Sequence, residues 1–140
     1  MKVLFAADGS KYTKKALAFL VAHENLAGPK DELVVLNVQP PVPPRVKGML
    51  GAANINAYHS DEAKKVLDPI ERFLKRHKIP LRASWVVGSP AAEVVRAAKR
   101  EKAHMIVMGT HGHGILGRAV MGSVAQRVVT DSDVPVLLVK

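Results

Sequence analysis

Apolar segments of two kinds alternate along this chain of 140 residues. Five apolar runs predict strands at residues 3–7, 33–38, 81–87, 104–108 and 134–139. Between them, apolar residues recur at helical spacing, which predicts helices after Ser10, over 59–77, from Ser89-Pro90 onward and over 123–130. This strict alternation predicts an α/β fold in one domain over 1–140. Its core is a single doubly wound, five-stranded parallel sheet with helices on both faces.

Three segments depart from the regular pattern. Residues 39–58 hold four prolines and are predicted to form an irregular loop, either functional or a tolerated surface insertion. Pro69 lies inside the apolar stripe of 59–77 and is expected to kink that helix. The run 81–87 alternates apolar residues with Arg82 and Ser84, which predicts a strand at the edge of the sheet.

The composition narrows the class of protein. Hydrophobic residues make up 48% of the chain, which argues against intrinsic disorder. The absence of cysteine excludes disulfide bonds and thiolate metal sites. The apolar run at residues 3–7 is too short for a signal peptide or a membrane span. We therefore expect a cytoplasmic protein with no membrane partner.

The chain is strongly basic. Its formal net charge of +9 suits polyanionic partners such as nucleotides, nucleic acids or an anionic surface. The charges are dispersed, however, and aromatic residues are only 4% of the chain, so the stacking residues of a single-strand-binding protein are missing. We interpret the basic residues as solvated helix faces and ends, and nucleic acid is not the expected partner.

Glycines surround the end of the fourth predicted strand and the start of the last predicted helix. Gly109 and Gly112 follow the strand, and Gly122 precedes Ser123, which has capping-box spacing to Gln126. Glycine permits positive φ and close approach of the backbone to a ligand, and a helix N-terminus attracts anions. The arrangement favours a phosphate-binding cradle over a flexible surface loop.

Two better-known phosphate motifs do not fit this segment. A P-loop requires a lysine that is missing after Gly122, and residues 112–117 do not join a strand directly to a helix as a dinucleotide fingerprint does.

Arg118 lies between the glycines and is a candidate phosphate contact, with solvent exposure as the equal alternative. His111 and His113 lack a third ligand, so no metal site is expected there.

Asp8 stands directly after the first predicted strand, and Gly109 stands directly after the fourth. Ligands of open parallel sheets lie outside the carboxyl ends of the strands, where the strand order reverses. We therefore expect Asp8 and Gly109 to face one ligand, with Asp8 binding a ribose hydroxyl or a phosphate-bound metal. The alternative is that Asp8 is only a turn residue before Gly9.

The spacing Gly-x2-Gly-x9-Gly-Ser resembles the nucleotide-binding signature of the universal stress protein family. The resemblance extends over essentially the whole chain. It includes the opening segment 3–10, the helix start at 87–90 and the closing strand 134–139. Lys11 and the proline-rich segment 39–58 depart from the family pattern.

This resemblance implies a strand order of 3-2-1-4-5, a homodimer formed through the last strand, and ATP bound without a P-loop, alone or with Mg or Mn. By position, Asp8 and Val38 would contact the adenosine. The ribose and phosphates would be held, largely through the backbone, by Gly109, Gly112, Gly122, Ser123 and Val124.

The function that we expect is that of an ATP-binding stress-response module whose nucleotide state tunes its conformation or its choice of an unidentified protein partner. One alternative is slow ATP hydrolysis or autophosphorylation, for which only Asp8, His111 or His113 could act as a base. Another alternative is a basic protein that binds nucleic acid or an anionic surface. No catalytic residue is assigned.

Overall fold

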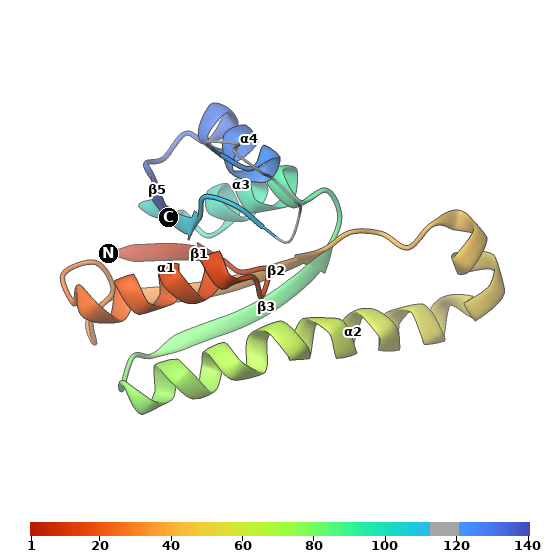
Figure 1. Ribbon diagram of the computed structural model, residues 1–140, viewed down its shortest axis with the longest axis horizontal. Helices are drawn as coiled ribbons and strands as arrows, with labels where there is room; N and C mark the ends of the chain where they lie inside the picture. The colour runs from red at the N-terminus through yellow and green to blue at the C-terminus, as the bar shows by residue number, and fades with distance from the viewer. Residues whose placement is uncertain (113–120) are drawn as a thin grey trace.

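The structure is a computed structural model that describes residues 1–112 and 121–140. In this part of the chain, five parallel strands form one sheet in the order β3-β2-β1-β4-β5, with helices on both faces (Figure 1). The elements in chain order are β1 (Lys2–Ala6), α1 (Lys11–Ala22), β2 (Glu32–Gln39), α2 (Pro44–Arg76), β3 (Leu81–Val87), α3 (Pro90–Arg100), β4 (Met105–Gly109), α4 (Ser123–Asp131) and β5 (Val136–Val139).

The helices form a layer on each face of the sheet. Phe5 of β1 packs with Leu20 of α1 and Leu74 of α2 on one face. Leu4 of β1 packs with residues of α3 and α4, including Val128, on the other. Successive strand residues point to opposite faces, so a strand covered on both sides must be apolar at every position. This requirement explains the continuous apolar runs of the central strands.

The predicted α/β fold and the strand order implied by the family resemblance are confirmed. β1 is central and pairs in parallel with both β2 and β4. β3 lies at one edge of the sheet, as its alternating pattern predicts, and β5 lies at the other. The chain passes from the β2 side of β1 to the β4 side, so the strand order reverses at the carboxyl ends of β1 and β4.

The segment 39–58 differs from the irregular loop that we expected. Helix α2 already begins at Pro44, because proline is well suited to the first helical position, where its missing N–H costs nothing. Helix α2 has a kink at Gly51, whose φ of 76° lies in the left-handed region. The helix continues past Pro69 because Ile70 and Leu74 beyond it are buried against the sheet.

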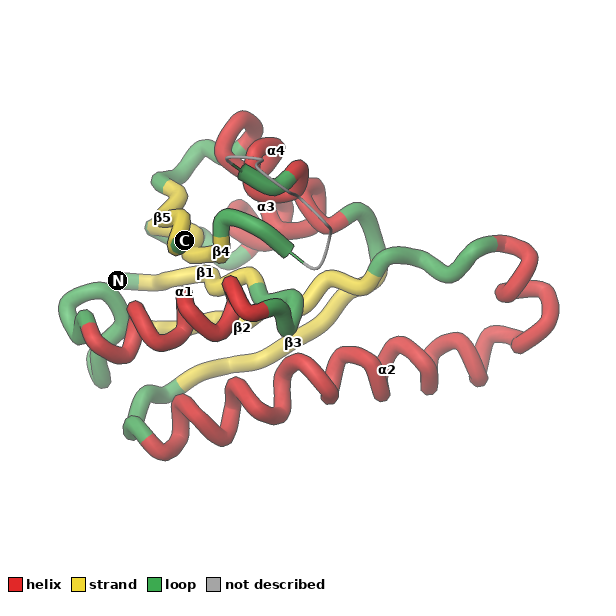
Figure 2. The backbone as a smooth tube through the Cα atoms, viewed as in Figure 1, coloured by secondary structure: helices red, strands yellow, loops and turns green. Residues whose placement is uncertain are grey.

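The first part of α2 extends beyond the sheet as an arm (Figure 2). It exposes Val46, Met49, Leu50 and Tyr58 to solvent. None of the helices in the described residues combines the length and the hydropathy needed to cross a membrane.

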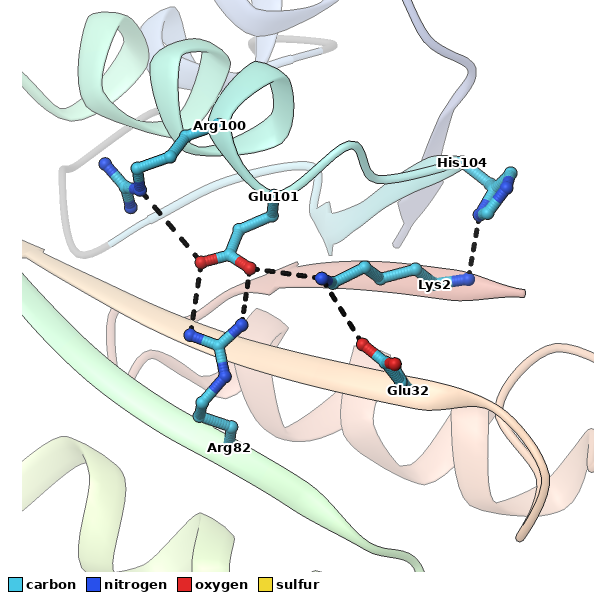
Figure 3. Close-up of polar contacts among 6 residues, drawn as sticks. All are labelled: Lys2, Glu32, Arg82, Arg100, Glu101 and His104. Carbon is cyan, nitrogen blue, oxygen red and sulfur yellow. Dashed lines mark hydrogen bonds and ion pairs between the residues drawn. The ribbon is translucent and has the colours of Figure 1, made fainter.

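A cluster of charged side chains lies at the amino ends of the strands, away from their carboxyl ends (Figure 3). Both guanidinium NH groups of Arg82 in β3 donate to the carboxylate of Glu101, the residue that follows α3. Nζ of Lys2 in β1 lies 3.2 Å from the same carboxylate and 3.3 Å from that of Glu32 in β2. The hydrogen bonds from Arg82, followed by those from Lys2, lower the pKa of Glu101 to about 2. The cluster therefore joins three strands to the end of α3.

Candidate functional site

A cavity of about 440 Å³ opens at the carboxyl ends of β1, β2 and β4, between α2 and the start of α4. We call this cavity the cleft. The structure brings together on its wall all the predicted site residues that it describes: Asp8, Val38, Gly109, Gly112, Gly122, Ser123 and Val124. Arg118 and His113 lie outside the described residues.

Asp8 is oriented by the turn that joins β1 to α1. Gly9 has a φ of 78°, a conformation that glycine adopts without strain. Oδ1 of Asp8 accepts hydrogen bonds from the N–H of Ser10 at 2.9 Å and the hydroxyl of Thr13 at 2.7 Å. Oγ of Ser10 in turn accepts from the N–H of Thr13 at 3.3 Å and caps α1. Asp8 therefore both builds the turn and lines the cleft.

Gly109 and Gly112 are constrained by contacts within the protein. A Cβ atom at Gly109 would lie 2.5 Å from Cβ of Tyr12 in α1, and one at Gly112 would lie 2.7 Å from Oδ2 of Asp8. Both distances are shorter than van der Waals contact. Neither glycine has positive φ, which occurs at Gly9 and Gly51 among the described glycines. Positive φ, one of the two glycine properties that the sequence suggested, is therefore not the reason for glycine here.

The start of α4 also differs from expectation. Its N-cap is Gly122, and Ser123 is the first helical residue, so the capping box expected between Ser123 and Gln126 is wrong. The N–H of Gly122 donates to the carbonyl oxygen of Thr110 at 2.7 Å, which leaves little room for a side chain. A Cβ there would lie 3.2 Å from the same oxygen. This hydrogen bond holds the start of α4 against the segment that follows β4.

The first turn of α4 borders the cleft. The first intrahelical bond runs from the N–H of Gln126 to the oxygen of Gly122 at 2.9 Å. The amides of Ser123, Val124 and Ala125 precede it, and all three residues line the cleft. A helix N-terminus of this kind carries partial positive charge.

Asn37 is a site residue that the sequence reasoning missed. It is buried in β2, where its Nδ2 donates to the carbonyl oxygen of Ala7 at 2.8 Å and its Oδ1 accepts from Nε2 of Gln39 at 2.6 Å. The bond to Ala7 ties the ends of β1 and β2 together beside the cleft, while the bond from Gln39 lies within β2. The signal was present in the sequence, since Asn37 is the single polar residue inside an apolar run.

His111 and Glu62 also line the cleft. The His111 ring lies 4.8 Å from the ring of Tyr12, and its Nδ1 is 2.8 Å from Oγ1 of Thr110. Glu62 comes from α2, which the sequence did not connect with the site. Among the described residues that line the cleft there is no lysine or arginine.

A doubly wound parallel sheet with a glycine-lined cleft at the reversal of its strand order is the architecture of nucleotide-binding α/β proteins. The model of the Universal stress protein family matches residues 1–140, and the chain belongs to this family. The universal stress protein in the QAH/OAS sulfhydrylase 3′ region of Thermus aquaticus is 33% identical over 143 residues, covering 99% of this chain and 97% of that protein.

Solved structures share the fold. That of MJ0577, a universal stress protein of Methanocaldococcus jannaschii, has a TM-score of 0.85 and 29% identity, over 99% of this chain and 94% of the other. A universal stress protein in complex with cAMP has a TM-score of 0.73 and 24% identity, over 100% and 97% of the two chains. The Archaeoglobus fulgidus protein in complex with dAMP has a TM-score of 0.69 and 22% identity, over 100% and 98%.

Proposed function

We propose that this protein binds ATP in the cleft and acts as a nucleotide-responsive module of the stress response. The observation that carries the proposal is that Ser123, Val124 and Ala125, whose backbone amides precede the first intrahelical bond of α4, all line the cleft. Amides and the helix dipole together favour a bound phosphate. In this role the nucleotide biases the conformation of the protein or its choice of a protein partner.

The proposed contacts follow the order of the elements around the cleft. Asp8 and Val38, at the ends of β1 and β2, contact the adenosine. The ribose and phosphates are held largely through backbone atoms of Gly109, Gly112, Gly122, Ser123 and Val124. The cavity of about 440 Å³ falls in the usual size range of small-molecule sites. The cAMP and dAMP complexes of two relatives support a nucleotide as the class of ligand.

We expect binding without rapid turnover. Fast phosphoryl transfer requires a positioned metal ion and cationic side chains around the phosphates. The described cleft residues include no lysine or arginine, and the described part of the chain has no group of three or more His, Cys, Asp or Glu residues able to hold a metal. A Mg or Mn ion accompanying ATP would therefore be ligated mainly by phosphate oxygens.

Mass spectrometry of the small molecules released when the purified protein is denatured tests the proposal. The expected result is an adenine nucleotide, present at close to one per chain and absent from the Gly122→Val variant. Purified protein that releases no nucleotide and binds none on titration would contradict it.

The net charge of +9 favours a second candidate function, the binding of nucleic acid or an anionic surface. Salt distinguishes the two. Binding to a polyanion through many phosphate contacts weakens steeply as salt rises. Nucleotide binding in a cleft lined by backbone amides weakens much less. A titration of ATP and of a DNA oligonucleotide at low and high salt separates these outcomes.

A further inference from the structure

The cleft has two chemically different ends. At one end lie the amides of α4 and the segment after β4, and at the other lie the end of β2 and a face of α2. β1 separates β2 from β4 in the sheet, and α2 and α4 cover opposite faces of it (Figure 1). The two ends of the cleft are therefore formed by elements on different sides of β1 and of the sheet.

Glu62 brings a carboxylate to the α2 end. It lines the cleft together with Val66, one turn further along α2, and its side chain is 35% exposed. Between them, Ala63 is fully buried against the sheet. Glu62 therefore lies at the border between the helix face that packs on the sheet and the opening of the cleft.

The carboxylate of Glu62 can accept a further hydrogen bond. Among the residues that the structure describes, Nζ of Lys65 donates to its Oε1 at 2.8 Å and Oε2 is left for another donor. An ionised carboxylate only accepts hydrogen bonds, so its ligand must present an N–H or O–H group.

We propose that Glu62 accepts a hydrogen bond from the exocyclic amine of the nucleobase and thereby sets both the orientation and the base preference of the bound nucleotide. The inference rests on the proposed function, since it requires a nucleotide whose phosphates lie at α4. With the phosphates there, the base extends toward β2 and α2. The 6-amino group of adenine is the donor that matches Glu62, while the apolar side chains of Val38 and Val66 contact the ring.

A double-mutant cycle tests this contact. ATP and the triphosphate of purine riboside, which lacks only the 6-amino group, are titrated by calorimetry into the wild-type protein and the Glu62→Ala variant. A charged hydrogen bond of this kind is expected to make ATP bind about tenfold more tightly than the purine analogue to the wild type. In Glu62→Ala this ratio falls to about one, because neither ligand finds the acceptor.

Glu71 provides a matched control on the same helix. Its side chain is 37% exposed, and Oε2 lies 3.8 Å from Nζ of Lys75, but it does not line the cleft. Glu71→Ala is expected to retain the tenfold preference, and Glu62→Gln, which keeps an uncharged acceptor, to fall between the wild type and Glu62→Ala.

The outcomes separate this inference from the proposed function. If the wild type binds ATP but Glu62→Ala keeps the full preference for it over the purine analogue, Glu62 does not contact the amine. If the wild type binds both ligands equally, the base preference is wrong although nucleotide binding stands. If the wild type binds neither, the proposed function fails and the inference fails with it.

Discussion

Glycines of this chain differ in how closely other atoms surround them, which gives a test at the scale of single residues. Gly109→Ala forces a methyl group to 2.5 Å from Cβ of Tyr12, so we expect the free energy of unfolding to fall by about 1–3 kcal/mol from overpacking. Gly48 in α2 is the control, because a Cβ there meets nothing within 4 Å. Gly48→Ala should stabilise the protein by up to about 1 kcal/mol. Urea denaturation measures both, and equal effects would contradict the packing account.

The stability effect of a substitution at His59 is a second prediction for a single residue. It is a buried residue of α2 whose ring lies 6.4 Å from that of Trp85, and its Nδ1 has no hydrogen-bond partner among the described residues. An unpaired buried polar atom costs free energy that an apolar side chain of similar size avoids. His59→Leu is therefore expected to raise the stability by about 1 kcal/mol in calorimetric unfolding. A clear loss of stability would show that Nδ1 has a partner in solution.

The residues of the site were predictable where they follow strand ends. Asp8 and Gly109 could be placed together because parallel strands bring their carboxyl ends to one edge of the sheet. Glu62 could not, because its place in the cleft depends on how α2 packs across the sheet. Ser123 was misassigned as a cap because Gly122, one position earlier, meets the geometric need of an N-cap without a side chain.

The charged cluster around Glu101 gives a prediction at the scale of the elements that it joins. Because its pKa in the folded protein, about 2, is below the usual value near 4.5, Glu101 stabilises the folded state at pH above 4.5. This contribution is lost as pH falls from about 4.5 toward 2.

Urea denaturation of the wild type and Glu101→Gln at several pH values measures the effect. The variant should be less stable at pH 7, and the difference should shrink toward zero near pH 2. Lys99→Gln is a suitable control, since its partner Asp133 is 75% exposed and the pair contributes little. A stability difference for Glu101→Gln that does not depend on pH would contradict the account.

The elements themselves were largely predictable from periodicity, with one exception. The strands and the helices that pack on them carry apolar patterns because both must bury a face. The first part of α2 extends beyond the sheet, and the prolines before it suggested a loop although Val46, Met49 and Leu50 have helical spacing. Pro44 instead begins the helix, and a kink that was not expected lies at Gly51.

At the scale of the whole molecule, β5 is an edge strand of four apolar residues. An unprotected apolar edge invites pairing with another chain, and pairing with a symmetry mate would close it in a two-fold dimer. We therefore expect light scattering to give twice the chain mass of 15.1 kDa. A monodisperse monomer at high protein concentration would exclude this assembly.

The protein as a whole is expected to retain ATP and hydrolyse it slowly. Backbone amides stabilise the bound ground state about as well as the transition state, which gives affinity without turnover. We expect a rate well below ~1 s⁻¹ for clean protein in a steady-state assay. Ordinary enzymatic turnover that is lost in Asp8→Asn would instead make this protein an ATPase.

The proposed place of ATP is where the start of α4 meets the segment after β4. Calorimetric titration of ATP into the wild type and Gly122→Val tests it most directly, with circular dichroism to establish that the variant is folded. The valine side chain would push against the Thr110 carbonyl and the Cα of His111, 3.2 and 3.3 Å from the Cβ position, and displace the amides of α4. The account predicts one ATP per chain for the wild type and no measurable binding for the variant. Unchanged affinity in a folded Gly122→Val protein would contradict it.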